Sequence, residues 1–121
     1  MKKIMIVDDE INILEILQRY LNRSGKLEIK TNSNPQNAID DAIRNFYDLI
    51  LVDIMMPIVD GMELLENVKK QNPSTKIILM TAYSTENKIN KSKELNADGY
   101  IKKPFENLEQ VEKIIFSTLN I

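Results

Sequence analysis

The sequence predicts an α/β fold, a doubly wound parallel sheet of five strands with helices on both faces. Two observations carry this prediction. Short apolar runs of strand length alternate along the chain with longer segments whose apolar residues recur at helical spacing. Glycine, proline and asparagine residues separate these segments. The chain has 121 residues, of which 43% are hydrophobic and 28% are charged, and we assign residues 1–121 to one globular domain.

The first third of the chain gives two strands and two helices. Residues 3–7 form an apolar strand that leads into three acidic residues, and residues 27–31 alternate as in a half-exposed or edge strand. The helix between them ends near Gly25, and the next begins after the N-cap Asn34 with a proline at its first position. The expected apolar stripes are Ile13, Leu14, Leu17 and Leu21 in the first helix, and Ala38, Ile39, Ala42, Ile43 and Phe46 in the second.

The third strand, residues 49–52, is continuously apolar. This suits a parallel strand covered on both faces, although so short a run also fits a buried helix segment. The strand leads directly to Asp53, and an ionised carboxylate beside a core costs free energy unless it is paired or liganded. Such conflicts tend to occur at functional sites. After the turn at Asp60-Gly61, a helix runs to about Gln71.

The last third of the chain completes the alternation. Residues 76–80 form a fourth strand that ends at Thr81. Residues 84–95 are polar with few apolar anchors, so we expect a helix that docks weakly on the sheet. A short fifth strand, residues 99–102, leads into Lys103-Pro104. The apolar stripe of the final helix is Leu108, Val111, Ile114, Ile115 and Leu119.

The composition excludes several kinds of chemistry. With a net charge of −2, the chain lacks the excess of basic residues that is typical of a protein that contacts nucleic acid. The chain has no cysteine for disulfide or thiol chemistry, which agrees with a cytoplasmic location, and no histidine as general base or metal ligand. Asp8 interrupts the N-terminal apolar run before it reaches the length of a signal peptide or membrane span, so we expect no membrane association.

The ends of the predicted strands carry the chemistry, because ligands of open α/β sheets bind outside the carboxyl ends of the strands. These ends hold Asp8, Asp9, Asp53, Thr81 and Lys103. Clustered carboxylates repel one another, and a hard divalent cation such as Mg²⁺ would relieve the repulsion. A carboxylate beside Mg²⁺, with an ammonium and a hydroxyl in reach, can attack a phosphorus centre and hold the resulting acyl phosphate.

In the order and placement of these residues, the whole chain resembles the response-regulator receiver domains of two-component signalling, typified by the chemotaxis response regulator. The resemblance implies a flavodoxin-like sheet of strand order 2-1-3-4-5 with five helices. It implies Mg²⁺ as the cofactor and a histidine kinase or histidine phosphotransfer protein as the phosphodonor. It also implies no enzymatic activity beyond the domain's own phosphorylation and dephosphorylation. Thr81-Ala82-Tyr83 and residues 92–95 further resemble single-domain receivers of sporulation-type phosphorelays.

The resemblance implies a phosphoryl-transfer role for five residues. Asp53 is the expected phosphoacceptor. Asp9 and Asp53 would bind Mg²⁺ through their carboxylates, Met55 would bind it through its backbone carbonyl, and Asp8 would act through water. Lys103 would pair with the acyl phosphate.

The resemblance also implies a set of switching and tuning residues. Thr81 is the expected switch hydroxyl, and Tyr100 the aromatic whose rotamer follows it. Met55 and Tyr83 stand where the family tunes the lifetime of the phosphoryl group. The change would be relayed to the face formed by the fourth helix, the fifth strand and the fifth helix. Receivers commonly meet their phosphodonor through the first helix and the loop after the fifth strand, so Ile13, otherwise a core or edge residue, is a candidate docking residue.

Several alternatives stay open from the sequence. The chain could be a stand-alone receiver, which we favour, or a receiver module cut from a longer transcriptional regulator. It could be a monomer or a phosphorylation-dependent dimer, and its downstream target is an unknown protein. An aspartyl-nucleophile phosphatase would need a second aspartate where Met55 stands, and a nucleotide-binding module would need a glycine-rich loop after the first strand. Taken alone, Asp53 also fits a helix-capping or turn residue.

Overall fold

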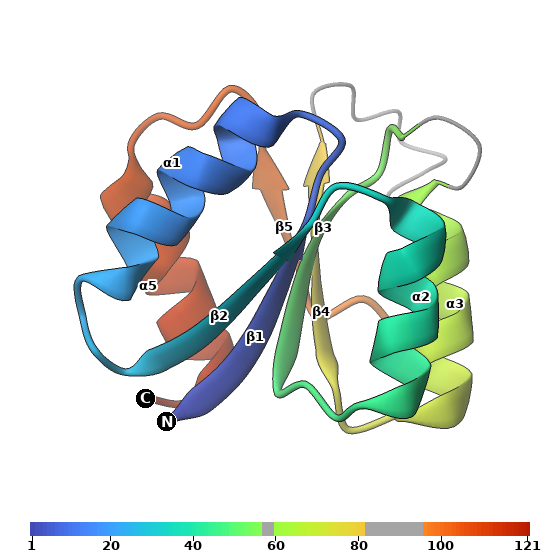
Figure 1. Cartoon of the computed structure of the whole chain (residues 1–121). Coiled ribbons are helices and arrows are strands. Elements are labelled where there is room, and N and C mark those ends of the chain that lie inside the picture. Colours follow the sequence, from blue (N-terminus) through green and yellow to red (C-terminus); the bar gives the residue numbers. More distant parts are fainter. Residues whose placement is uncertain (57–59, 82–95) are drawn as a thin grey trace.

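The computed structural model shows a sheet flanked by helices on both faces, and it describes residues 1–56, 60–81 and 96–121 (Figure 1). The five strands are β1 (Lys2–Val7), β2 (Leu27–Asn32), β3 (Leu49–Asp53), β4 (Lys76–Thr81) and β5 (Gly99–Lys102). The helices in the described part of the chain are α1 (Ile11–Asn22), α2 (Pro35–Arg44), α3 (Gly61–Gln71) and α5 (Leu108–Leu119).

The strands form one sheet in the order β2-β1-β3-β4-β5, and every neighbouring pair is parallel. The predicted five-stranded parallel sheet and its strand order are therefore confirmed. The helix expected at residues 84–95 lies outside the described residues, so the structure shows four helices over the ranges it describes.

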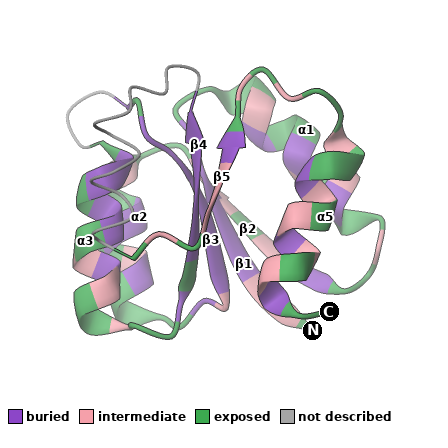
Figure 2. Cartoon of the chain, turned by 180° about the vertical axis from the view of Figure 1, so that it is seen from behind, coloured by how far each residue is buried: buried purple, intermediate pink, exposed green. Residues whose placement is uncertain are grey.

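Two apolar cores lie on the two faces of the sheet. α1 and α5 cover one face, and α2 and α3 cover the other (Figure 1). The central strands are almost wholly buried between these helices, as Figure 2 shows. Every residue of β3 is buried, which confirms that residues 49–52 form a strand with two covered faces rather than a helix segment. β2 lies at the sheet edge and alternates in burial, as its sequence predicts.

The predicted apolar stripe of α2 is too long. The helix ends at Arg44, and Phe46 lies beyond it with 51% of its surface exposed, while Ile43 is 39% exposed. The reason is that Asn45 has extended backbone and ends the helix, after which Tyr47 occupies the buried position instead. The α1 prediction was closer, because the helix ends at Asn22 and Gly25 follows with φ of +71°.

Candidate functional site

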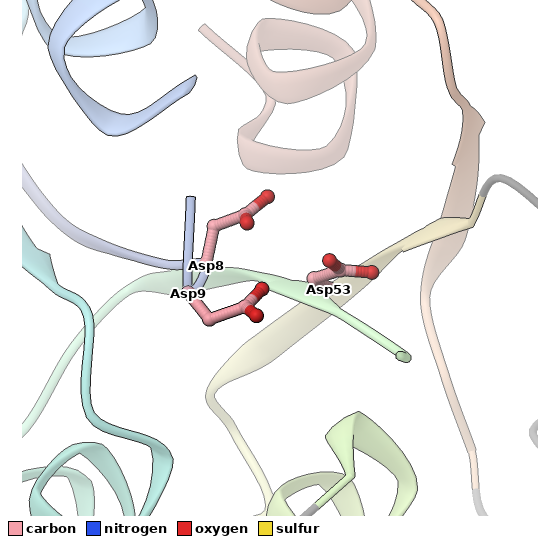
Figure 3. Close-up of side chains that lie close together, drawn as sticks. All are labelled: Asp8, Asp9 and Asp53. Carbon is pink, nitrogen blue, oxygen red and sulfur yellow. The ribbon is translucent and has the colours of Figure 1, made fainter. Parts of the chain in front are cut away.

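The site lies where β1 and β3 end side by side. These strands are adjacent and parallel with Val7 opposite Val52, so Asp8 and Asp53 follow at the same level of the sheet. Asp9 comes from the loop that leads to α1. Carboxylate oxygens of Asp8, Asp9 and Asp53 all lie within 4.8 Å of one another, and Figure 3 shows the three side chains gathered at these strand ends. The acidic cluster expected at the carboxyl edge of the sheet is therefore present.

This cluster combines two buried carboxylates with one exposed carboxylate. Asp8 and Asp53 are buried, whereas Asp9 is exposed. One oxygen of Asp8 accepts a hydrogen bond from the Glu10 backbone N–H at 2.9 Å, and one oxygen of Asp53 accepts from the Met55 N–H at 3.1 Å. An all-oxygen donor set of this kind fits a hard cation such as Mg²⁺, which uses a few carboxylates and retains water ligands.

Lys103 brings a positive charge to the cluster from the far end of the sequence. It follows β5 directly, and its backbone N–H donates to the Thr81 carbonyl at 2.8 Å. Its Nζ donates to Asp8 Oδ2 at 2.6 Å and to Asp53 Oδ2 at 3.1 Å, and only 10% of the side chain is exposed. The ammonium therefore lies between two buried carboxylates. The Lys103-Pro104 peptide bond is cis.

Burial and charge shift the ionisation of this pair. Burial raises the pKa of Asp53, and the nearby Asp8 adds to the increase, while the Lys103 ammonium offsets only part of it. Burial alone would lower the pKa of Lys103, but Asp8 and Asp53 together outweigh it and raise that pKa. Lys103 is thus held in its charged form beside a carboxylate whose ionisation carries a cost.

Thr81 is the last residue of β4 and lies next to the end of β3. Met80 pairs with Asp53 across the two strands, so Thr81 follows at the carboxyl edge. Thr81 is buried, and its Oγ1 has no hydrogen-bond partner within residues 1–56, 60–81 and 96–121. A buried hydroxyl without a partner costs about 1–3 kcal/mol. This unsatisfied hydroxyl fits a site that receives a further polar group.

The other expected site residues are placed in three ways. Met55 lies two residues after Asp53, donates its N–H to that carboxylate, and has 48% of its surface exposed. Tyr100 lies on β5, is partly buried, and packs against the core beneath α2 and α3. Tyr83 lies outside the described residues.

Gly61 is a residue of the site that sequence reasoning treated only as a turn. Its N–H donates to the Ile54 carbonyl at 3.0 Å, and a Cβ at this position would lie 2.4 Å from the Asp53 carbonyl oxygen. Only glycine lets the start of α3 approach the backbone of the acidic strand so closely. The sequence offered one signal, the Asp-Gly pair, but the close approach depends on how α3 packs against β3.

A groove of about 400 Å³ opens beside Lys103. Ile13 and Ile16 line it from α1, and Phe105 and Leu108 line it from the opposite side. Ile13 is partly buried against the core, which agrees with the packing role expected for it. The groove gives the site an apolar surface that a partner protein could contact.

Comparison with known proteins identifies the family. The response regulator receiver domain matches residues 4–115. The chain belongs to this family. It is 36% identical over 115 residues to the response regulator ArlR of Staphylococcus aureus, a match that covers 94% of this chain and 51% of ArlR. This receiver domain therefore spans about half the length of the curated relatives it matches.

Solved structures of other receiver domains have the same fold. A CheY-like receiver domain protein from Methanospirillum hungatei superposes with a TM-score of 0.94 at 31% identity, covering 99% of this chain and 94% of that one. The BeF3-activated receiver domain of DrrB gives a TM-score of 0.88 at 30% identity, covering 100% of this chain and 99% of that one. Within residues 1–56, 60–81 and 96–121, no helix is long and apolar enough to cross a membrane.

Proposed function

We propose that this receiver domain is a phosphorylation-activated signalling switch in which Asp53 accepts a phosphoryl group. The observation that carries the proposal is the placement of Asp53 beside Asp8, Asp9 and Lys103, at the carboxyl edge of a receiver sheet. The phosphodonor is a histidine kinase or a histidine phosphotransfer protein, because these supply the phosphoryl group to the two-component systems in which this family works.

The acidic cluster is suited to hold Mg²⁺ in this function. Asp9 and Asp53 would bind it through their carboxylates, Met55 through its backbone carbonyl, and Asp8 through water. Bound there, the cation would neutralise the carboxylates and the oxygens of the transferred group. Among the described residues, Lys103 is the ion-pair partner of both Asp8 and Asp53. One ammonium cannot balance a cluster of three carboxylates, and this excess of negative charge supports the assignment.

The protein's own residues supply the rest of the phosphoryl transfer. A carboxylate oxygen of Asp53 attacks phosphorus, the P–N bond to the donor histidine breaks, and a P–O bond forms. Lys103 keeps its contact with Asp8 and pairs its ammonium with a phosphoryl oxygen in place of Asp53. The Thr81 hydroxyl, which lacks a partner among the described residues, donates to another phosphoryl oxygen.

The same residues can convert phosphorylation into a change of surface. Movement of Thr81 toward the phosphoryl group changes the packing at the end of β4, and Tyr100 on the neighbouring strand β5 responds to it. The change spreads to the face that combines residues 84–95, β5 and α5, while α2 and α3 stay nearly still. Met55 and Tyr83 set the lifetime of the phosphoryl group. The DrrB receiver domain, which has this fold, was solved in a BeF3-activated form.

The partners follow from the surface around the site. The groove between α1 and the loop after β5 would receive the phosphodonor, with Ile13 and Phe105 as contacts. The same mechanism serves a stand-alone receiver and the receiver module of a longer regulator, and the match to half of ArlR keeps both possibilities open. In either form we place the domain in the cytoplasm, where it acts on a protein target as a monomer or a phosphorylation-dependent dimer.

We propose that the site does not serve a phosphatase with external substrates. Met55 stands where an aspartyl phosphatase would need its second carboxylate, and it offers no acid or base. We therefore propose no reaction beyond the domain's own phosphorylation and dephosphorylation.

Intact mass after incubation with acetyl phosphate tests the function. We expect a single labile phosphoryl adduct that requires Mg²⁺ and is absent in Asp53→Asn. Asp41→Asn, which changes a carboxylate on α2 that is paired with Lys30 and does not belong to the acidic cluster, should still form the adduct. An adduct that persists in Asp53→Asn, or one that forms equally well without Mg²⁺, would contradict the proposed acceptor or the proposed metal site.

A further inference from the structure

The position of β5 decides where Lys103 lies. β5 is a four-residue strand at the edge of the described sheet, where it pairs with β4 from Ile78 opposite Gly99 to Thr81 opposite Lys102. Residues 82–98 connect the two strands, so the covalent connection alone leaves their register open. A slip of one residue would turn every β5 side chain to the other face and carry Lys103 away from the carboxylates.

Asp98 ties the start of β5 to β4 through two hydrogen bonds. Its backbone N–H donates to the Ile77 carbonyl at 2.8 Å, and its carboxylate Oδ2 accepts from the Ile77 N–H at 2.8 Å. The side chain thus takes the place of the carbonyl that a longer β5 would offer to Ile77. Asp98, the residue immediately before β5, therefore satisfies both the N–H and the carbonyl group of Ile77.

Lys69 of α3 fixes the Asp98 carboxylate in this position. Its Nζ donates to Asp98 Oδ2 at 2.8 Å and to the Thr75 carbonyl at 2.7 Å. The two side chains are only 13% and 21% exposed, and Lys76 adds a longer contact to the other Asp98 oxygen at 3.9 Å. An exposed ion pair is worth little, but here a mostly enclosed carboxylate accepts a backbone hydrogen bond and a charged one together.

We infer that Asp98 is a positioning residue for the functional site, which with Lys69 locks the register of β5 on β4 and thereby sets Lys103 between Asp8 and Asp53. The lock lies at the amino end of β5, opposite the site. At the carboxyl end of the same strand, the Lys103 N–H donates to the Thr81 carbonyl, so both ends of the strand are fixed to β4. The expected effect of Asp98 on phosphoryl transfer rests on the proposed function, whereas the lock on the register of β5 does not.

The first test is the rate of phosphorylation by acetyl phosphate with Mg²⁺, followed by intact mass in a double-mutant cycle. Displacing a catalytic group by about 1 Å can cost up to about a hundredfold in rate, so we expect Asp98→Ala to slow adduct formation about tenfold. In a Lys103→Met background the same change should cost less than about twofold, because Asp98 acts through Lys103. Asp98→Asn retains an oxygen for the Ile77 N–H and should restore most of the rate.

A matched control is Asp41→Ala, which removes another carboxylate that is paired with a lysine, at 2.7 Å from Lys30 Nζ. It should leave the rate unchanged, because the Asp41–Lys30 pair joins α2 to β2 and takes no part in the contacts that hold β5 against β4. Equal slowing by Asp98→Ala with and without Lys103, or an equal loss in Asp41→Ala, would overturn the inference and leave Asp98 with a role in stability alone.

Hydrogen exchange at the Lys103 amide tests the lock without any phosphoryl transfer. Asp98→Ala should speed exchange there about tenfold relative to amides of β1, and Asp41→Ala should not. Unchanged exchange at Lys103 would overturn the lock, even if phosphorylation slows. If the wild-type protein forms no adduct, the proposed function fails while this measurement still decides the inference. If Asp98→Ala does not fold, Lys69→Met takes its place in both measurements with the same expected direction and the same contradicting outcome.

Discussion

Two carboxylates in this molecule, Asp53 and Asp41, are each paired with a lysine, and their pKa values move in opposite directions. Burial raises the pKa of Asp53, and its lysine offsets only part of that increase. Burial also acts to raise the pKa of Asp41, but hydrogen bonds from Lys30, Asn45 and Tyr47 outweigh it and lower the pKa. The fold therefore stabilises the ionised carboxylate of Asp41 and destabilises that of Asp53, although each is paired with a lysine.

The difference lies in how completely each carboxylate is satisfied. Asp41 accepts from Lys30 at 2.7 Å, from Asn45 at 2.8 Å and from Tyr47 at 2.9 Å. The two contacts of Asp53, with Lys103 and the Met55 N–H, are both 3.1 Å long, and Asp53 shares that lysine with Asp8. Asp41 is therefore a structural residue. Asp53 retains capacity for a cation and for a phosphoryl group.

Replacing each of the two lysines by methionine should give the largest difference in stability between the two sites. Lys103→Met leaves Asp8 and Asp53 buried without their cation, and the loss of one partner of a buried ion pair costs about 3–5 kcal/mol. Lys30 is 54% exposed, and the loss of an exposed partner costs about 1 kcal/mol or less. Urea unfolding of both variants measures these free energies.

Mg²⁺ provides the control for this pair of variants. Added Mg²⁺ should restore part of the stability of Lys103→Met, because it replaces the missing positive charge in the acidic cluster. It should leave the difference between Lys30→Met and the wild type unchanged. A Lys103→Met variant as stable as Lys30→Met would show that the acidic cluster is better solvated than its burial indicates.

Crowding the backbone of Asp53 should have the next largest effect. A Cβ at Gly61 would lie 2.4 Å from the Asp53 carbonyl oxygen, so Gly61→Ala forces α3 and β3 apart and should cost about 2 kcal/mol. At Gly99 the nearest atom lies at an ordinary 3.6 Å, and Gly99→Ala should cost less than about 1 kcal/mol. Thermal unfolding compares the two variants, and equal losses would rule out the close approach at Gly61.

Sequence periodicity predicted the sheet because each strand carries its own apolar pattern. The uninterrupted run of residues 49–52 identified the strand that is buried on both faces, and Asp53 stood out as the polar residue at its end. The acidic cluster was predictable for the same reason, since parallel strands bring their carboxyl ends to one edge. The strand order and the roles of individual residues came from the family resemblance.

The sequence was less informative where side chains from distant elements meet. Phe46 continued the helical spacing of α2, but Asn45 ended the helix and Tyr47 entered the core, which periodicity does not reveal. The close approach at Gly61 and the contact of Lys69 with Asp98 depend on the packing of α3, so no local sequence pattern predicts them. That the Thr81 hydroxyl has no partner among the described residues likewise becomes visible only in the folded site.

Replacing each carboxylate by the neutral amide should change stability in opposite directions. Without metal at pH 7, Asp53→Asn removes a charge that is costly to bury, and should raise the free energy of unfolding. Asp41→Asn removes a well-satisfied charge and should lower it by about 1 kcal/mol. Urea unfolding in EDTA measures both values. Changes of the same sign would contradict the contrast between the two sites.

The pH dependence of these differences should separate the two sites further, with the smallest effects. The lowered pKa of Asp41 means that its stabilisation is complete above the ordinary carboxyl pKa of 3.8 and is lost as the pH falls through the folded-state value. The raised pKa of Asp53 means that its cost is absent at low pH and grows as the pH rises from 3.8 through its folded-state value. The penalty of Asp41→Asn should therefore change with pH below 3.8, and the gain of Asp53→Asn above it. Denaturant titrations from pH 2.5 to 7 locate both windows; a gain for Asp53→Asn that stays constant across this range would mean that burial does not control the ionisation of Asp53.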